Sequence, residues 1–428
     1  MTRTETEAPR SPETPVDPHR NSRRAILAIL LGMAMIGPFS SNMYLPSLSS
    51  MTAVFGTTVS TVQLTVSVYA LGLAAGILVY GPLSDRFGRR PVLLASLAIY
   101  LGASVACAFA PDIEFLIAAR FVQAFGACGG GNLGRAIVRD SFDRSEIPRI
   151  LSLMASVLSL APAVAPIVGG YLQEHLGWQS TFMVMAIMGA TILLSAALFL
   201  EETNRNKNPA ATSIVCIYHN ARTLLTNRCY LGNALVAGLS FGALFSYSSN
   251  SAFVFIDVLH LSAREYGHTF MALAGSYFTG ALLGARMSVR LGASRMVPLG
   301  LAISVGAIST GCILAWGGWM SIWTVLPIGC LQYFANALIQ PSSQAGAITP
   351  FPRMAGTASS LLGFSQMAFA AGISWLISAQ FDHTTRPLLS MMLLCATLAL
   401  LVWLFVLPRS ELACEIEGGE QQPAPGGR

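Results

Sequence analysis

The polar connection between two long apolar segments reads Gly81-Pro-Leu-Ser-Asp85-Arg86-Phe-Gly88-Arg89-Arg90-Pro91. The Gly-Pro pair favours the end of a helix, and Gly88 permits a tight turn before the next one. The arginines favour a position in water, at the membrane face where basic loops are retained. Asp85 is the only acid here, and we expect it to pair with a neighbouring arginine or to cap a helix N-terminus. The plainer interpretation is a basic loop that only orients the chain.

The composition of the chain is that of a membrane protein. Of 428 residues, 54% are hydrophobic and 11% are charged, and the mean hydropathy is +0.60. Soluble domains carry about 25% charged residues, so a soluble multidomain enzyme is excluded. A bilayer span needs about 20 apolar residues, and we predict an all-α membrane protein with twelve transmembrane helices. The predicted apolar runs are residues 25–46, 62–82, 92–110, 113–135, 148–172, 178–200, 229–255, 268–285, 296–316, 319–343, 355–379 and 387–408.

Polar stretches divide these spans into two sets of six. The prediction is a disordered cytoplasmic leader (1–24), an N-terminal six-helix half (25–200), a cytoplasmic linker between the halves (201–228), a C-terminal six-helix half (229–408) and a disordered cytoplasmic tail (409–428). If the N-terminus lies in the cytoplasm, all but three of the 25 basic residues lie on the cytoplasmic side of the membrane. Because basic loops stay in the cytoplasm, both termini are predicted to be cytoplasmic. The three exceptions are Arg120, Arg264 and Arg386.

A faint internal repeat relates the two halves. The Ser-x-Arg-x-Gly pattern of residues 84–88 returns at residues 288–292, each time just after the second apolar run of its half. Two six-helix halves with a substrate site between them, near the middle of the bilayer, form a transporter architecture. The repeat therefore indicates transport as the function.

The segment at 81–91 resembles the signature loop between helices 2 and 3 of the major facilitator superfamily. The resemblance implies the fold of that family, with twelve helices in two halves. In the family this loop is a conformational latch between the halves and does not contact substrate. The resemblance assigns the latch role to Gly81, Asp85, Arg86, Gly88, Arg89 and Arg90.

A second match lies in the fourth apolar run, where Arg120-Phe-Val-Gln123-Ala-Phe-Gly126 resembles the helix-4 motif of the family. The arginine of that motif is buried and takes part in proton coupling. Arg120 is also the only cation well inside a predicted span, and an intramembrane charge is costly enough to mark a functional candidate. The alternative is that its side chain reaches the outer membrane surface.

The fifth run contains Ala161-Pro162-Ala-Val-Ala165-Pro166-Ile-Val-Gly169-Gly170, which resembles the antiporter motif of drug:proton exporters. Ala165 stands where that motif usually has glycine. The two prolines bend a helix, and the glycine pair lets a neighbour approach closely. A kinked transmembrane helix without this function would share these features.

Two further segments narrow the resemblance to the bicyclomycin and chloramphenicol resistance branch (Bcr/CflA) of drug:proton antiporters. They are Asn42-Met-Tyr44-Leu-Pro46 and Gly134-Arg-Ala-Ile-Val-Arg-Asp140. The branch usually has aspartate at the position of Asn42, where an acid is suited to carry a proton. Asparagine cannot titrate, and no acid lies plainly at the middle of a predicted span. Either Asp257 or a histidine of the outer loops couples transport to protons, or the mechanism differs from that of the relatives.

Amide side chains follow one face of the tenth run. Gln332, Asn336 and Gln340 recur every four residues, which places them on one side of a helix. With Tyr247 and Asn250 of the seventh run they are candidates for lining a substrate cavity. The alternative is that they form hydrogen bonds between helices. Asn42, Tyr44, Arg120 and Gln123 are the candidates for coupling or substrate contact.

The sequence predicts a secondary active transporter, with proton-coupled efflux of drugs or antibiotics as the first hypothesis. The second is a dedicated exporter or importer of one metabolite, such as a siderophore or a biosynthetic product. The third is a membrane sensor that kept the fold without transport. We expect no enzyme activity, cofactor, metal or nucleic-acid partner, because the motifs for these are missing. The expected surroundings are a small-molecule solute, protons and the lipid bilayer, for a monomer in the bacterial cytoplasmic (inner) membrane.

Overall fold

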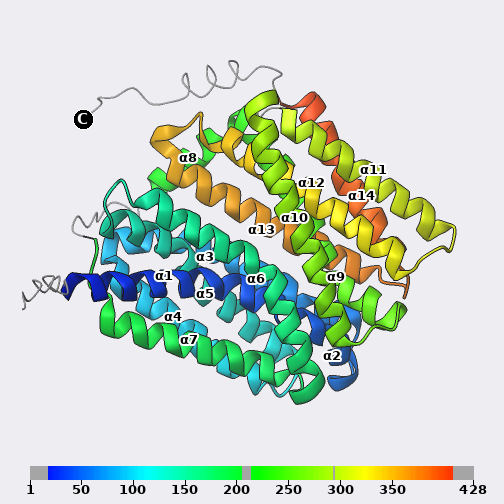
Figure 1. Cartoon of the computed structure of the whole chain (residues 1–428), viewed down its shortest axis with the longest axis horizontal. Coiled ribbons are helices and arrows are strands. Elements are labelled where there is room, and N and C mark those ends of the chain that lie inside the picture. Colours follow the sequence, from blue (N-terminus) through cyan, green and yellow to red (C-terminus); the bar gives the residue numbers. More distant parts are fainter. Residues whose placement is uncertain (1–17, 205–213, 293–294, 408–428) are drawn as a thin grey trace, which may run out of the picture.

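The computed structural model describes residues 18–204, 214–292 and 295–407 (Figure 1). These residues form helices and their connections, as the composition predicts. The elements in chain order are α1 (Pro18–Asn42), η1 (Leu45–Ser47), α2 (Leu48–Val54), α3 (Val59–Phe87), α4 (Arg89–Ala108), α5 (Ile113–Ser141), α6 (Ile147–Leu176), α7 (Gln179–Phe199), α8 (Ile214–Thr226), α9 (Arg228–Ala252), η3 (Phe253–Val258), α10 (Ala263–Leu291), α11 (Met296–Trp316), α12 (Ile322–Ile348), η5 (Pro352–Met354), α13 (Ala355–Ala379) and α14 (Arg386–Phe405).

Eleven stretches of the described chain are long and apolar enough to cross a membrane, which makes this a multi-pass membrane protein. The exception among the long helices is α10, which has 29 residues but is not one of the eleven. Its apolar sequence is interrupted by small polar residues such as Ser276 and Thr279. The predicted number of twelve spans therefore stays a prediction.

The helices pack in two groups. The first group is α1 to α7, and the second group is α9 to α14; they meet along α3 with α13 and along α6 with α10 (Figure 1). We name the two ends of the bundle after residues found there. The Gly88 end holds the connections α3–α4 and α5–α6, and the Asp257 end holds the connections α1–α3 and α9–α10.

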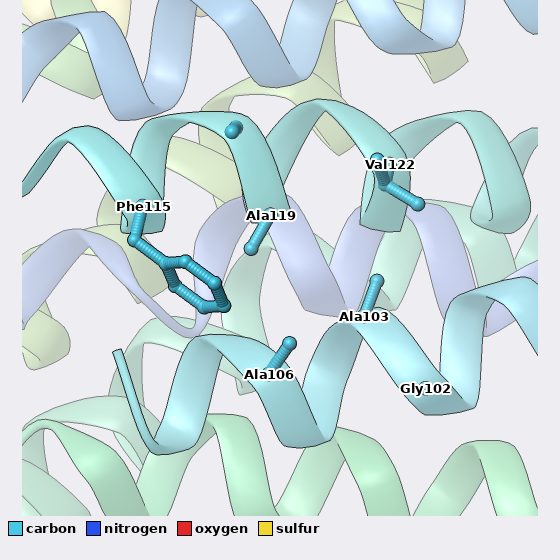
Figure 2. Close-up of a pocket in the computed structure, with 7 residues that line it drawn as sticks. Gly102, Ala103, Ala106, Phe115, Ala119 and Val122 are labelled. Atoms are coloured by element: carbon cyan, nitrogen blue, oxygen red, sulfur yellow. The ribbon is translucent and has the colours of Figure 1, made fainter. Parts of the chain in front are cut away.

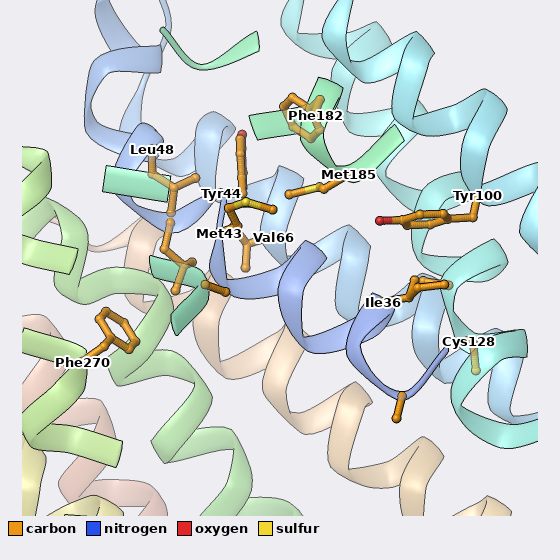
Figure 3. Packing of buried hydrophobic residues seen from close by; sticks show 14 of the residues in the cluster. Ile36, Met43, Tyr44, Leu48, Val66, Tyr100, Cys128, Phe182, Met185 and Phe270 are labelled. Carbon is orange, nitrogen blue, oxygen red and sulfur yellow. The ribbon is translucent and has the colours of Figure 1, made fainter. Parts of the chain in front are cut away.

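Glycines allow the closest contacts within the first group. A Cβ atom on Gly126 of α5 would lie 2.5 Å from the backbone nitrogen of Tyr100 on α4. A Cβ atom on Gly72 of α3 would lie 2.5 Å from the carbonyl oxygen of Phe121 on α5. Small residues are what lets helices pack without a hydrophobic driving force from water. Around these contacts the core runs continuously from the first group to Phe270 of the second (Figure 3).

The sequence repeat has a structural counterpart. Gly88 ends α3 and Gly292 ends α10, with φ of 112° and 87° respectively. In both cases the glycine N–H donates to the carbonyl of the serine four residues earlier, Ser84 or Ser288, at 3.0 Å. A positive φ favours glycine over other residues, so this spacing explains why both glycines recur.

Some expectations about the connections between helices differ from the structure, and others lie outside the described residues. The helix α3 continues through Gly81 and Pro82, which were expected to end it, as far as Phe87. The leader was predicted disordered to residue 24, but α1 begins at Pro18, where proline's fixed φ suits the first turn of a helix. The predicted linker 201–228 contains the helix α8. Cys229 is disulfide-bonded. The rest of the leader and the tail 409–428 lie outside the described residues.

Replacing Gly126 with alanine is expected to lower the thermal midpoint of the purified protein in detergent. The added methyl group overlaps the α4 backbone, and overpacking of this kind costs about 1–3 kcal/mol. Gly131→Ala on the same helix is the control: its Cβ would meet open space, and alanine favours a helix over glycine. A Gly126→Ala midpoint equal to that of Gly131→Ala would show that α4 and α5 do not pack as described.

Candidate functional site

The loop at residues 84–90 is held by a network of hydrogen bonds within the first group. The Arg89 guanidinium donates to the Asp85 carboxylate at 2.5 Å and to the Asp140 carboxylate of α5 at 3.1 Å. It also donates to the Ser84 hydroxyl at 2.5 Å. Asp85 thus pairs with a neighbouring arginine, which is one of the two roles expected for it. The other role, capping a helix N-terminus, belongs to a different acid.

Glu202 caps α4. Its carboxylate accepts the backbone N–H groups of Arg89 at 2.9 Å and of Arg90 at 3.3 Å, in the first turn of that helix. A negative charge at a helix N-terminus is favourable because the free N–H groups and the helix dipole are positive there. The carboxylate lies directly against the Cα of Gly88, where any side chain would meet it. Glycine is therefore required both for its φ and for this contact.

The residues after α7 bind the same loop. The Asn204 side chain donates to the carbonyls of Ser84 at 3.3 Å and of Asp85 at 3.2 Å. The Arg90 guanidinium donates to the Ala197 carbonyl of α7 at 2.9 Å. The sequence analysis missed Glu202 and Asn204. Their only signal was an acid at the start of the longest polar stretch, which is common in loops.

Arg120 is completely buried inside the first group. Its guanidinium lies 4.1 Å from the ring centre of Tyr69, 4.7 Å from that of Tyr44 and 5.6 Å from that of Phe182. Figure 3 shows the Tyr44 and Phe182 rings of this cage. The aromatic faces compensate part of the charge through cation–π attraction. The alternative, in which Arg120 reaches the membrane surface, is wrong in this structure.

The polar contacts of Arg120 join α1 and α5. The guanidinium donates to Gln123 Oε1 at 2.6 Å and to the Ser40 carbonyl of α1 at 3.2 Å. Its Nε and Nη2 have no hydrogen-bond partner in the described structure. Gln123 in turn donates to the Ser104 hydroxyl of α4 at 2.8 Å. Arg120 and Gln123 therefore form one unit, as the shared motif suggests.

The last turn of α1 receives side-chain donors from three directions. The final carbonyls of a helix lack partners within it, and here the Ser40 carbonyl accepts from Arg120. The carbonyl of Pro38 accepts from the Asn42 amide at 2.8 Å, and that of Gly37 accepts from the Tyr69 hydroxyl at 3.2 Å. Asn42 thus acts as a hydrogen-bond donor. An ionised aspartate could only accept.

The proline- and glycine-rich part of α6 forms the closest contact between the groups. A Cβ on Gly170 would lie 2.6 Å from the Ala263 carbonyl of α10, and one on Gly267 of α10 would lie 2.6 Å from the Pro166 carbonyl. Gly169 lies directly on the Met43 carbonyl, after α1. Pro162 lies two turns before this contact in the same helix. Backbone meets backbone here, so any larger side chain would separate the two groups.

Polar side chains also cross between the groups near the Asp257 end. The Ser49 hydroxyl of α2 donates to Asp257, and the Gln63 amide of α3 donates to the Ser374 hydroxyl of α13 at 2.7 Å. Among the carboxylates with a hydrogen bond in the described residues, Asp257 alone has its partner in the other group. It is exposed at this end. Hydrogen bonds therefore join the two groups at the Asp257 end.

The amide stripe of α12 is buried. The exposed fractions are 1% for Gln332, 1% for Asn336 and 6% for Gln340. Each amide bonds to a neighbouring helix: Gln332 accepts from Ser304 of α11 at 2.6 Å, and Asn336 and Gln340 donate to carbonyls of α9 at 2.9 Å. In this conformation they join helices, which favours the packing alternative; a role in a cavity stays a prediction.

Tyr247 and Asn250 are buried as well. The Tyr247 hydroxyl donates to the Val325 carbonyl of α12 at 3.2 Å and lies directly against Gly329. Asn250 belongs to a polar cluster between α9 and α13. Figure 2 shows a groove elsewhere, between α4 and α5, lined by Gly102, Ala103, Ala106, Phe115, Ala118, Ala119 and Val122. It has no polar side chain, and none of the candidate residues lines it.

No group of histidine, cysteine or acidic side chains suited to a metal occurs in the described ranges 18–204, 214–292 and 295–407.

Comparison with known proteins gives matches over most of the chain. The family model described as Major Facilitator Superfamily matches residues 30–375. A bicyclomycin resistance protein homolog of Haemophilus influenzae is 30% identical, covering 90% of this chain and 97% of the relative. Multidrug resistance protein D of Escherichia coli is 28% identical, covering 89% and 95%. The crystal structure of a D-xylose–proton symporter aligns with a TM-score of 0.73 at 15% identity, covering 90% and 98%.

Replacing Glu202 with glutamine should make the loop at residues 84–90, which we call the Gly88 loop, accessible to protease. Glutamine keeps one acceptor but loses the charge that strengthens the bonds to the α4 N-terminus, and a charged hydrogen bond contributes about 1.5–3 kcal/mol. We expect trypsin to cut after Arg86 or Arg89 about tenfold faster in the purified protein.

Glu201→Gln is the matched control, since Glu201 is the exposed neighbour with no described hydrogen bond to the loop. Equal cleavage rates in the two variants would mean that Glu202 does not hold the loop.

Proposed function

The chain belongs to the major facilitator superfamily, and on that basis we propose that it is a secondary transporter that exports drugs or antibiotics in exchange for protons. The names of its relatives support this: one is a bicyclomycin resistance protein homolog and another a multidrug resistance protein. Their bacterial sources support the cytoplasmic (inner) membrane as its location. The chain acts as a monomer, without enzymatic chemistry or cofactor.

The proposed topology has twelve spans in two halves, 25–200 and 229–408, with both termini in the cytoplasm. The arginines around residues 86–90 support a cytoplasmic position for the Gly88 end. The Asp257 end then faces outward. It carries the exposed side chains of Trp316, Trp319 and Trp323, and tryptophan favours the boundary between lipid and water.

The observation that carries the proposal is the asymmetry between the two ends. At the Asp257 end the groups meet backbone to backbone through Gly170 and Gly267, and Gln63 bonds across to Ser374. At the Gly88 end, Asp85, Arg89 and Arg90 bond within α3 to α7 and the residues just after them. We infer from the contacts at the Asp257 end that this conformation faces the cytoplasm. Transport then requires the α6–α10 contact to separate.

Coupling to protons has to work without an acid at position 42. The Asn42 amide donates to Pro38 at every pH, so the end of α1 keeps one protonation state. Asp257 is the candidate for coupling, because it is exposed at one end and its hydrogen bond to Ser49 breaks when that end opens. Arg120 acts as a positioning residue: it fixes the end of α1, and thereby Tyr44, through the Ser40 carbonyl.

A dedicated exporter or importer of one metabolite is the second candidate. Asn42 favours it, since asparagine cannot titrate where the branch that the sequence resembles usually has aspartate. The two candidates differ in the range of compounds: a drug exporter protects cells against several classes of antibiotic, and a dedicated transporter against none or one.

Inverted membrane vesicles test the proposal. We expect vesicles carrying the chain to accumulate chloramphenicol or tetraphenylphosphonium when their interior is acidified, and to lose the accumulated probe when a protonophore is added. Asp85→Asn should slow accumulation at least tenfold at equal protein levels, because the loop loses its ion pair with Arg89. Asp382→Asn is the control, since Asp382 bonds only within its own loop.

Accumulation that is independent of the gradient would exclude proton-driven export. Accumulation of neither probe, together with unchanged drug susceptibility of a deletion strain, would favour the dedicated transporter. Full activity in Asp85→Asn would exclude the latch role of the Gly88 loop.

A further inference from the structure

A cluster of uncharged polar side chains lies where α3, α9 and α13 meet. Ser374 of α13 is its centre: it accepts from the Gln63 amide at 2.7 Å, shares a hydrogen bond with the Ser249 hydroxyl at 2.6 Å and accepts from the Asn250 amide at 3.2 Å. Asn250 accepts from the Ser378 hydroxyl at 2.7 Å. We call these five residues the Ser374 cluster. It joins the two groups through Gln63.

Three buried polar atoms at this cluster lack a partner. They are Gln63 Oε1, the Ser67 hydroxyl and the Ser246 hydroxyl, on residues that are 0%, 3% and 0% exposed. Leaving a buried polar group without a hydrogen bond costs about 1–3 kcal/mol. Three such groups at one contact surface are therefore unexpected unless something binds them during the working cycle.

The helix register places the two hydroxyls at the same level. Ser67 is one turn from Gln63 along α3, and Ser246 is one turn from Asn250 along α9, where its carbonyl accepts the Asn250 amide at 3.0 Å. Both steps lead toward the Gly88 end, because α3 and α9 run in opposite directions. One turn from Ser374 in that direction, α13 has Ala370. Alanine offers no side-chain hydrogen bond at this level of α13.

The position suits a transported solute. Ser246 and Ser67 lie about three and about six residues from the middles of their spans, on the side of the Asp257 end, and Gln63 and Ser374 lie nearer that end. Transporters bind substrate near the middle of the membrane at the contact between their halves. Opening the Asp257 end would separate Gln63 from Ser374 and free the hydrogen-bonding groups of both. The cluster contains amides and hydroxyls but neither a carboxylate nor a cation, so it has nothing to neutralise a charged group buried there.

We propose that Gln63, Ser67, Ser246 and the Ser374 cluster form a subsite for the uncharged hydroxyl or amide groups of the transported solute. This inference rests on the proposed transport function. While the groups are joined at the Asp257 end, as they are in this structure, the Gln63 amide and the Ser374 hydroxyl bond to each other. When the groups separate at the Asp257 end, the solute bonds to Gln63 Oε1 and to the hydroxyls of Ser67 and Ser246. Compounds that carry hydroxyl or amide groups are recognised there, and cations without them are not.

Alanine variants of the free hydroxyls test the subsite, because a structural role and a binding role predict opposite results. The side chains of Ser67 and Ser246 make no hydrogen bond in this structure. A purely structural role therefore predicts unchanged transport and an unchanged or higher thermal midpoint. A binding role predicts that each variant raises the KM for chloramphenicol, which has hydroxyl and amide groups, about fivefold. The KM for tetraphenylphosphonium, which has neither, should not change.

Ser343→Ala is the matched control. Its hydroxyl is also buried and without a partner, but it lies near the Gly88 end of α12, away from the cluster. The subsite is excluded if Ser67→Ala and Ser246→Ala leave the KM for chloramphenicol unchanged, as they would if only a water molecule fills the place. An equal rise for both probes excludes it too, as does a wild-type chain that transports only tetraphenylphosphonium. Transport of neither probe by the wild type would instead overturn the proposed export of drugs.

Discussion

Polar groups buried among these helices must find their partners on other helices, because neither a hydrocarbon bilayer nor an apolar core supplies one. This constraint governs each feature of the candidate site. Because of it, the amide side chains of α12 form hydrogen bonds to α9 and α11. For the same reason Arg120 packs against three aromatic rings and donates to the end of α1. It also makes the unpartnered hydroxyls of Ser67 and Ser246 informative, since a transporter has to expose such groups in one state and bury them in another.

The two ends of the bundle are linked through the first group. At the Gly88 end, Glu202 and Asn204 bind the residues just after α7 to the loop that follows α3. At the Asp257 end, the chain leaving α1 passes Tyr44, which lies beside Arg120, and reaches Ser49, the partner of Asp257. Arg120 thus fixes the geometry of the segment that closes this end. A change in that segment is carried to α3, because the Tyr44 hydroxyl shares a hydrogen bond with Thr65.

The sequence was sufficient to predict an all-helical membrane protein and the local contacts of the site. Hydropathy predicted the helices, and motif residues such as Asp85 and Arg120 have the ion pair and the burial expected of them. Partners distant in sequence could not be predicted: Glu202 caps α4 across 113 positions, and Gln63 meets Ser374 across 311. The amides of α12 show a further limit. Their spacing gave one helical face, but a face toward a cavity and a face toward a neighbouring helix have the same period.

Alternating access between the two ends is the central claim, and a cross-link tests it most directly. The Arg264 guanidinium of α10 lies 4.9 Å from the ring centre of Tyr171 on α6, across the contact between the groups. In a background without reactive cysteines, Tyr171→Cys and Arg264→Cys would place two thiols at this contact. A short bifunctional thiol reagent should abolish vesicle transport, and a reagent with a cleavable disulfide should allow its recovery on reduction. The same treatment of a Ser50→Cys and Gln173→Cys pair, which lies within the first group at the same end, should leave transport intact. Undiminished transport by the chain cross-linked between positions 171 and 264 would contradict the account, because the Asp257 end would then never need to open.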